Sequence, residues 1–395
     1  MTTAAIPVSR NAPLHWLALG AFAVGTEGFM IAAILPRIAS DLSISIAAAG
    51  QIVTVFALSY AFSSPILTTL TGNIDRRNLL IFSMALFAVS NLVAASVPNY
   101  WTLIAARVLL AFSAGLYVPN ANALAGLLVP PERRGRAIAI INGGLTSAIA
   151  LGVPLGAVIG NNVGWRMTFV GVAVLASVAL VGLMTGLPRD IGAGMTATSL
   201  SRRVKVLRQP GVLGALIVTM LWAIGGYTVY TYIAPLLAAT VGLAGEGVGY
   251  AVFLWGLAAG IGLAIGGSLV DRRGADFVVA LCLPLTTLAL VSLSASGLFL
   301  SQTAALVPVM AAIGLWGASH WAFWPGQQSR LIATAGLSVA PVALSLNASF
   351  MYLGFSLGAM LGSFTLMKGE VQDLGLVGGS CILASFLLFL ATRRK

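Results

Sequence analysis

The sequence is poor in charged residues, which make up only 8% of its 395 residues, whereas hydrophobic residues make up 59%. Soluble domains carry about 25% charged and 45–50% apolar residues. The scarcity of charge therefore excludes a soluble globular domain and predicts a polytopic membrane protein.

Cysteine, histidine and lysine are also rare, and each shortage excludes a class of protein. Cys282 and Cys381 lie in apolar segments without metal-ligand spacing, so we expect buried free thiols. None of the three lysines follows a glycine, which excludes a phosphate-binding loop and ATP as the energy source within this chain. Because no nucleophile is paired with a base, we expect no enzyme activity, no metal and no cofactor.

The net charge of +11 would suggest nucleic acid as the partner of a soluble protein, but its placement indicates topology instead. With the N-terminus inside the cell, 17 of the 21 cations fall in cytoplasmic segments, and only Arg37, Arg107, Arg166 and Lys368 lie elsewhere. By the positive-inside rule we expect a bacterial inner-membrane protein with both termini in the cytoplasm. The first apolar segment is too long for a signal-peptide core and is expected to be retained.

Apolar stretches long enough to span a bilayer follow one another along the chain. The sequence predicts twelve transmembrane helices, and an even number places both termini on the same side. The expected ranges are 14–36, 46–71, 79–97, 101–129, 136–160, 166–187, 211–238, 246–270, 275–300, 304–329, 338–366 and 371–391.

One long polar connection, residues 188–210, divides these spans six and six. It contains Arg202, Arg203, Lys205 and Arg208, which is typical of a cytoplasmic linker with a short helix on the inner leaflet. The sequence therefore predicts an N-terminal six-helix bundle (1–187), a linker (188–210) and a C-terminal six-helix bundle (211–395).

The two halves repeat similar features about 200 residues apart. Residues 72–77 follow the second span and 267–274 follow the eighth, each with Asp-Arg-Arg. The first span is expected to end at Pro36 and the seventh at Pro235. Glycines recur every fourth residue in the fifth and eleventh spans, at Gly152, Gly156, Gly160, Gly354, Gly358 and Gly362. Parallel six-helix repeats favour a transporter whose site lies at the repeat interface, near the bilayer midplane.

Several stretches resemble one known family over essentially the whole chain. They are residues 26–29, 35–42, 75–77, 151–156, 164–169 and 227–235. The sequence is similar to the major facilitator superfamily in its drug:proton antiporter branch, and especially to bacterial exporters of sugars, purine ribonucleosides and chloramphenicol. The resemblance implies an all-α membrane fold of two pseudo-symmetric six-helix bundles, with helices 1, 4, 7 and 10 around a central cavity.

Glu27 is the only acidic residue deep inside a span, where a carboxylate costs about 2.5–3.5 kcal/mol on insertion scales. It lies nine residues before Pro36, roughly 13 Å from the expected helix end, and Arg107 lies roughly 9 Å into helix 4. The two side chains can meet if the helices are neighbours, and the resemblance implies that helix 4 carries an arginine that faces helix 1. A permanent pair would keep Glu27 charged, so proton coupling requires Arg107 to be lost as a partner in one conformation.

His320 is the other titratable candidate in a span, because imidazole can change charge near neutral pH. A lone histidine among aromatic residues can equally be a packed polar group. Its neighbours Trp316, Trp321 and Trp324 are typical of cavity lining, and aromatic faces bind sugars, nucleobases and drugs alike. The helix arrangement that the resemblance implies adds Asn120, Asn122, Tyr227 and Tyr230 as candidate substrate ligands, although each could form an ordinary interhelical hydrogen bond.

Two further sets of residues are candidates for gating. Gly152 and Gly156 permit close helix packing, and Pro154 between them can bend the fifth span. The resemblance implies that this motif is typical of antiporters and that the loop acids latch the cytoplasmic side closed. The alternative is that the loop acids are solvated turn residues. The loop candidates are Gly72, Asp75, Arg76, Asp271 and Arg272.

The sequence thus predicts a proton-coupled antiporter that exports a small polar or amphipathic molecule such as a sugar, nucleoside or drug. An importer or facilitator on the same fold is the alternative, and a membrane-embedded enzyme or receptor is a third class. We expect protons as the coupling ion, a small-molecule substrate and the lipid bilayer as partners, and a monomer.

Overall fold

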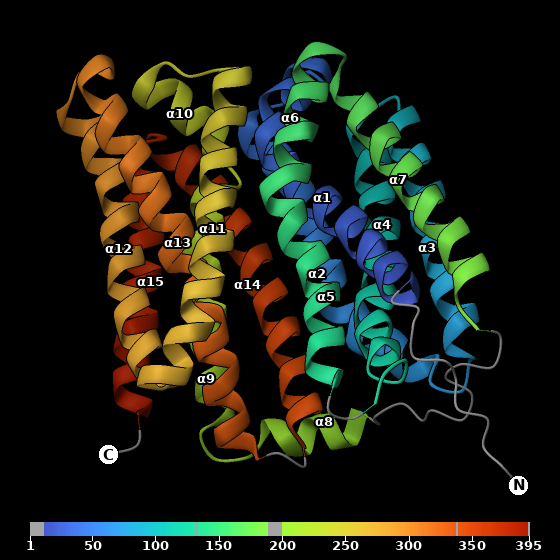
Figure 1. The fold of residues 1–395 in the computed structure, drawn as a ribbon. Helices are drawn as coiled ribbons and strands as arrows, with labels where there is room; N and C mark the ends of the chain where they lie inside the picture. The colour runs from blue at the N-terminus through green and yellow to red at the C-terminus, as the bar shows by residue number, and fades with distance from the viewer. Residues whose placement is uncertain (1–11, 131–132, 189–199, 337–338, 394–395) are drawn as a thin grey trace, which may run out of the picture.

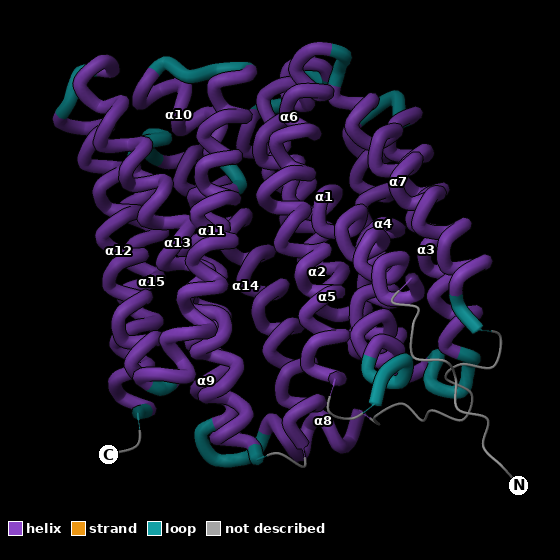
Figure 2. Tube along the Cα trace, viewed as in Figure 1, coloured by secondary structure: helices purple, strands orange, loops and turns teal. Residues whose placement is uncertain are grey.

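The computed structural model describes residues 12–130, 133–188, 200–336 and 339–393, almost entirely as helices joined by short loops (Figure 2). In these residues twelve helices are long and apolar enough to cross a membrane, as the sequence predicts. The elements are α1 Ala12–Asp41, α2 Ile46–Leu70, α3 Arg76–Ser96, α4 Tyr100–Ala125, α5 Arg134–Ser147, a π-helical turn Ala148–Gly152, α6 Val153–Asn162, α7 Trp165–Gly186, α8 Leu200–Leu207, α9 Val212–Tyr230, α10 Ile233–Val241, α11 Glu246–Arg273, α12 Ala275–Phe299, α13 Gln302–Ala335, α14 Ala340–Lys368 and α15 Asp373–Thr392.

The helices form two bundles, which confirms the predicted fold class. In Figure 1, α1–α7 lie on one side and α9–α15 on the other. Helix α14 packs along α2, and α11 packs along α6, so these pairs join the bundles. Ser356 and Ser363 of α14 donate hydrogen bonds to the Thr54 and Ala47 carbonyls of α2, both at 3.0 Å. The bundles therefore meet through helices that run side by side.

The short helix α8 lies beneath the junction of the bundles, within the stretch expected to be a linker (Figure 1). Arg203 donates one hydrogen bond to Ser345 of α14 at 2.7 Å and another to Thr68 of α2 at 3.4 Å. One guanidinium thus bridges both bundles. Residues 189–199 of the expected linker lie outside the described residues, and the exact domain borders stay a prediction.

Two helix ends expected at prolines differ from the prediction. Helix α1 does not end at Pro36 but continues to Asp41. Pro235 does not end the seventh span either, because it lies in the first turn of α10. Backbone N–H groups there have no partner within the helix, so the missing N–H of proline costs no hydrogen bond. Proline is tolerated inside membrane helices because neighbouring groups satisfy the freed backbone. Glu27 is therefore 14 residues from the end of its helix, roughly 21 Å rather than 13 Å.

The glycines of the fifth span pack against α1. A Cβ at Gly156 would lie 3.1 Å from the Cβ of Met30, tighter than an ordinary contact, and side chains at Gly152 and Gly160 would collide with Thr26 and Ile34. Because Thr26 immediately precedes Glu27 in the chain, the glycines allow the fifth span to approach the part of α1 that carries the buried carboxylate.

A π-helical turn, Ala148–Gly152, keeps small residues of the fifth span aligned along α1. Gly144, before the turn, packs against Ala18 of α1, and Ala148, the first residue of the turn, packs against Gly25. The later glycines pack against α1 further along the helix. In an α-helix four residues rotate about 400°, so every fourth side chain drifts by about 40° around the helix axis. The extra residue of a π-helical turn rotates the following side chains back by about 100°. The turn therefore offsets most of the drift between Gly144 and Gly160. Pro154, expected to bend this span, lies two residues after it.

The eleventh span repeats this packing in the C-terminal bundle. Side chains at Gly354 and Gly358 of α14 would collide with α9, at Met220 and Ile224 respectively. The fifth span packs on the first, and the eleventh packs on the seventh. The sequence repeat is therefore a repeat of helix contacts.

We predict that Gly156→Leu gives a folded protein with weak transport or a leak, because the larger side chain separates α6 from α1. Overpacking costs about 1–3 kcal/mol, so transport should fall at least about fivefold. Flux in proteoliposomes measures the rate, and size-exclusion chromatography checks the fold.

Gly143→Leu is the matched control, because a Cβ at Gly143 in α5 meets nothing within 4 Å. It should transport close to the wild-type rate. A wild-type rate for Gly156→Leu would show that the close contact with Met30 is not needed.

Candidate functional site

Glu27 of α1 and Arg107 of α4 form an ion pair inside the N-terminal bundle. Both side chains are 0% exposed, and Arg107 Nη1 donates to Glu27 Oε1. The guanidinium also donates from Nε to the Ile52 carbonyl of α2 at 3.3 Å, and it lies 4.2 Å above the centre of the Phe56 ring. The contact that the sequence suggested between helices 1 and 4 is present.

The pair leaves hydrogen-bonding capacity unused on both partners. Glu27 Oε2 and Arg107 Nη2 are buried, and neither has a partner among the described residues. Arginine and carboxylate groups often pair through two parallel hydrogen bonds, whereas here one is formed. The carboxylate is thus bound by one direct hydrogen bond, and its second oxygen remains without a partner among the described residues.

A narrow cavity of about 10 Å³, room for about one water molecule, lies beside Glu27 and between the bundles. Its lining comes from α1, α2, α9 and α14. It includes Gly28, the chain neighbour of Glu27, and Phe56, whose ring lies beneath Arg107. The lining residues are Val24, Gly25, Gly28, Phe29, Val53, Phe56, Ala57, Tyr227, Tyr352 and Phe355. The ion pair therefore borders a space to which both bundles contribute.

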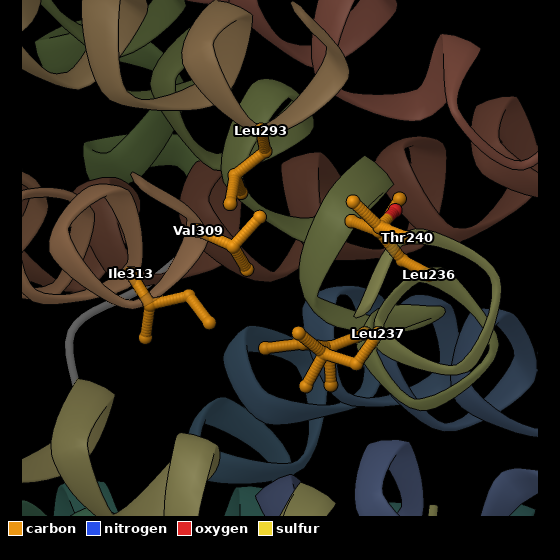
Figure 3. Close-up of a pocket in the computed structure, with 7 residues that line it drawn as sticks. Leu236, Leu237, Thr240, Leu293, Val309 and Ile313 are labelled. Atoms are coloured by element: carbon orange, nitrogen blue, oxygen red, sulfur yellow. The ribbon is translucent and has the colours of Figure 1, made fainter. Parts of the chain in front are cut away.

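A second, apolar space, too small to admit a water molecule, lies wholly among the C-terminal helices α10, α12 and α13 (Figure 3). Its lining is aliphatic except for one threonine and has no titratable side chain. The lining residues are Ile233, Leu236, Leu237, Thr240, Leu293, Val309 and Ile313. Without charge or aromatic faces, it is a packing space rather than a site for proton chemistry.

Aromatic side chains of the C-terminal bundle gather opposite α1. We define this aromatic cluster as Phe29, Tyr227, Tyr230, Trp255, Trp316, His320, Trp321 and Phe355. Phe29 is its one member from the N-terminal bundle, and its ring centre lies 6.1 Å from that of Tyr230 and 6.3 Å from that of Trp321. Phe29 is two residues from Glu27, so the ion pair and the cluster are joined by less than one turn of α1.

His320 is buried and packed rather than paired with a charge. Its ring stacks on Trp222 with centres 4.1 Å apart, and the Trp222 indole donates to the His320 carbonyl at 3.2 Å. The two interpretations of the sequence were a proton switch and a packed polar group, and this geometry favours the packed group.

The other predicted substrate residues occupy different places. Tyr227 lines the cavity and stacks on Phe355, and Tyr230 donates to the Phe29 carbonyl at 3.2 Å. Trp324 packs on Trp222.

The two asparagines of α4 are placed apart from the aromatic cluster. Asn120 accepts a hydrogen bond from the buried Arg76 at 3.0 Å and donates to the Leu116 carbonyl, so its amide serves the N-terminal bundle. Asn122 is half-buried, and its Oδ1 has no partner among the described residues.

The candidate loop residues have local roles in this conformation. Asp75 caps the N-terminus of α3 by accepting from the Asn78 amide at 2.9 Å. Arg76 also donates to the Gly72 carbonyl at 3.3 Å. Asp271 and Arg272 are exposed at the end of α11. The latch implied by the family resemblance stays a prediction.

Some aromatic residues near the site are not predictable from the sequence alone. Trp222, Trp255 and Phe355 belong to helices whose facing sides cannot be read from one sequence. A signal was nevertheless present, because five of the eight tryptophans fall in the last six spans. They are Trp222, Trp255, Trp316, Trp321 and Trp324.

Comparison with known proteins agrees with this architecture. A bacterial homologue of the human lysosomal transporter Spinster, solved in an inward-facing and occupied conformation, superposes with a TM-score of 0.76. It covers 96% of each chain at 17% sequence identity, which shows the shared fold alone.

Several relatives are named as transport proteins. YbcL of Bacillus subtilis, an uncharacterized MFS-type transporter, is 33% identical over 97% of each chain. The inner membrane transport protein YdhP of Escherichia coli K12 is 33% identical over 98% of this chain and 97% of its own. A chloramphenicol resistance protein of Streptomyces lividans is 33% identical over 69% of this chain and 70% of its own. The Major Facilitator Superfamily model matches residues 17–359, and the chain belongs to that superfamily of membrane transporters.

Proposed function

We propose that the protein is a proton-coupled antiporter that exports a small polar or amphipathic molecule, such as a sugar, nucleoside or drug. The observation that carries the proposal is the Glu27–Arg107 pair, fully buried beside a cavity lined by both bundles. An ionisable pair inside the membrane is costly, and such residues commonly mark ion or substrate pathways.

Proton coupling in this proposal depends on competition between Arg107 and a proton for the Glu27 carboxylate. While Arg107 is bound, the carboxylate is stabilised in its charged form. If the rearrangement of the bundles separates the two groups, a buried carboxylate without a cation favours its neutral form and takes up a proton. Return of Arg107 then expels that proton. Substrate binding and proton binding are thereby linked through one conformational equilibrium.

Export is the proposed direction for two reasons. The fifth span carries the Gly152-Val153-Pro154-Leu155-Gly156 motif that resembles the antiporter branch, and one relative is named as a chloramphenicol resistance protein. Import or facilitated diffusion on the same fold is the alternative. Uptake by inverted vesicles under an imposed pH gradient supports export, whereas uptake by right-side-out cells supports import.

We further propose that the protein is a monomer in the bacterial inner membrane with both termini in the cytoplasm. The described cations Arg77, Arg134 and Arg208 all fall on the side expected to be cytoplasmic. The proposed partners are the lipid bilayer and a small-molecule substrate, with protons as the coupling ion and no nucleic acid.

We predict that Glu27→Gln abolishes uphill transport driven by a pH gradient, because the amide mimics the protonated acid but cannot cycle charge. Ligand binding and substrate–substrate exchange should survive, since exchange needs no net proton movement. The measurement is gradient-driven flux and exchange in proteoliposomes, with a ligand identified by thermal shift among sugars, nucleosides and antibiotics.

Glu370→Gln is the matched control, because Glu370 is exposed in the loop before α15, and it should retain accumulation. Full gradient-driven accumulation by Glu27→Gln would make Glu27 a structural residue and leave His320 as the next candidate. Arg107→Ala should behave differently from both variants. It leaves the buried carboxylate uncompensated, at a cost of about 3–5 kcal/mol, and should lower the thermal stability of the protein, as a thermal-shift measurement would show.

We predict that at least one of Trp321 and Trp324 contacts substrate, because residues three apart share a helix face. Alanine at the contacting position should weaken binding about tenfold or more, given the large apolar area of an indole. Equilibrium binding of the ligand from the same screen measures this effect. Unchanged affinity in both alanine variants would place the site elsewhere.

A further inference from the structure

The short helix α8 is fixed to the C-terminal bundle by an apolar side chain. Val206 of α8 is 2% exposed and belongs to a small hydrophobic cluster that is separate from the main core. The other buried members of this cluster come from α9, α13 and α14, and they are Val212, Ala215, Leu216, Leu331, Val342, Ala343 and Leu346. Because these partners all belong to the C-terminal bundle, α8 moves with that bundle when the two bundles change their relative position.

Arg203, one turn before Val206, reaches from α8 into the line of contact between α2 and α14, which we call the α2–α14 seam. Its bond to Ser345 at 2.7 Å stays within the C-terminal bundle, whereas its bond to Thr68 at 3.4 Å crosses to α2. The Thr68 hydroxyl donates to the Ser64 carbonyl of its own helix at 2.6 Å, so its oxygen is free to accept from the guanidinium. The crossing bond therefore ties α2 to the unit formed by α8 and α14.

The crossing bond lies at one end of a seam that is closed along its length. Thr68 comes 21 residues after Ala47 in α2, roughly 32 Å along the helix. At the far end, Ser363 donates to the Ala47 carbonyl at 3.0 Å. Between the two ends, the rings of Tyr60 and Tyr352 stack with centres 3.7 Å apart. Separation of α2 from α14 at the α8 end must therefore break the bond to Thr68.

The second line of contact between the bundles, which we call the α5–α11 seam, is closed at one end only. Gly249, Gly256, Gly260 and Gly267 lie within about 40° of one another around α11, because seven residues complete almost two turns. A Cβ at either of the first two would meet the fifth span, whereas a Cβ at either of the last two meets nothing within 4 Å. The ribbons of α11 and the fifth span also diverge towards α8 (Figure 1). The bundles are thus apart at the α8 end of this seam.

We propose that Arg203 is a pin that holds the α2–α14 seam together at the α8 end, so that the bundles separate there along the α5–α11 seam alone. A guanidinium suits this role because its several N–H donors can bond acceptors on two helices at once. A molecule that enters or leaves at this end then passes between α5 and α11. The inference goes beyond the proposed function, since it holds for any substrate, coupling ion or direction of transport.

The test is double electron–electron resonance on the purified full-length protein, which measures distances between two spin labels. Labels on Leu70→Cys of α2 and Leu213→Cys of α9 span the α2–α14 seam, and labels on Ala139→Cys and Ser268→Cys span the α5–α11 seam. All four positions are exposed, and the two native cysteines are replaced by alanine. We expect one narrow distance distribution across the first seam and a broader distribution across the second.

Substitutions at the pin should then release the first seam. In Arg203→Ala the Leu70–Leu213 pair should show a second, longer distance, whose population rises about three- to tenfold because one hydrogen bond is lost. Thr68→Val should reproduce this result, since it removes the crossing acceptor and keeps the shape of the side chain.

Two variants are matched controls. Lys205→Ala removes the same charge from an exposed position of α8, and it should leave the distribution as in wild type. Ser345→Ala removes the partner of Arg203 inside the C-terminal bundle but keeps the crossing bond, so it should change the distribution less than Thr68→Val.

The inference is overturned if Arg203→Ala and Thr68→Val both leave the first seam unchanged, or if Lys205→Ala broadens it equally. Equal breadth of the two seams in the wild-type protein would also overturn it. If Arg203→Ala misfolds by size-exclusion chromatography, Thr68→Val decides. These distances are read without a substrate or a pH gradient, so failure of proton coupling in Glu27→Gln is a separate result.

Discussion

A carboxylate buried in a membrane protein must be compensated, and the compensation of Glu27 by Arg107 constrains the helices around it. The two side chains come from α1 and α4, so these helices must remain neighbours, and α2 supplies both a carbonyl and an aromatic ring to the guanidinium. On another face of α1, the glycines of the fifth span allow backbone approach beside Thr26 and Met30. Packing of the N-terminal bundle is thus organised so that the ion pair is withdrawn from lipid and water.

The charged and aromatic groups are divided between the bundles, and this division suggests how two binding events can influence each other. The ion pair belongs to the N-terminal bundle, whereas nearly all of the aromatic cluster belongs to the C-terminal bundle. Phe29 crosses between them and lies on the same helix as Glu27. Any displacement of its ring by a molecule among the tryptophans would also act on the helix that carries the carboxylate. Such an energetic link between sites is reciprocal.

Hydropathy was sufficient to predict the twelve spans, because an apolar stretch of bilayer length has few alternatives. The helix ends at Pro36 and Pro235 could not be predicted in this way, because a membrane helix can continue through proline once other groups satisfy its backbone. Glu27 was identifiable as the one deep acid, but its partner depended on knowing that α1 and α4 are neighbours. Asn120 illustrates the remaining difficulty, since its hydrogen bond to Arg76 depends on tertiary contacts that sequence spacing does not encode.

The π-helical turn at Ala148–Gly152 also bears on which changes of chain length the fifth span can tolerate. Deleting one residue there would restore a regular α-helix and preserve every hydrophobic residue beyond it. It would nevertheless rotate Gly156 and Gly160 by about 100° away from α1. Insertions and deletions in this segment are therefore constrained by angular register more than by composition. Substitutions in this segment are therefore tolerated more readily during evolution than the insertion or deletion of a residue.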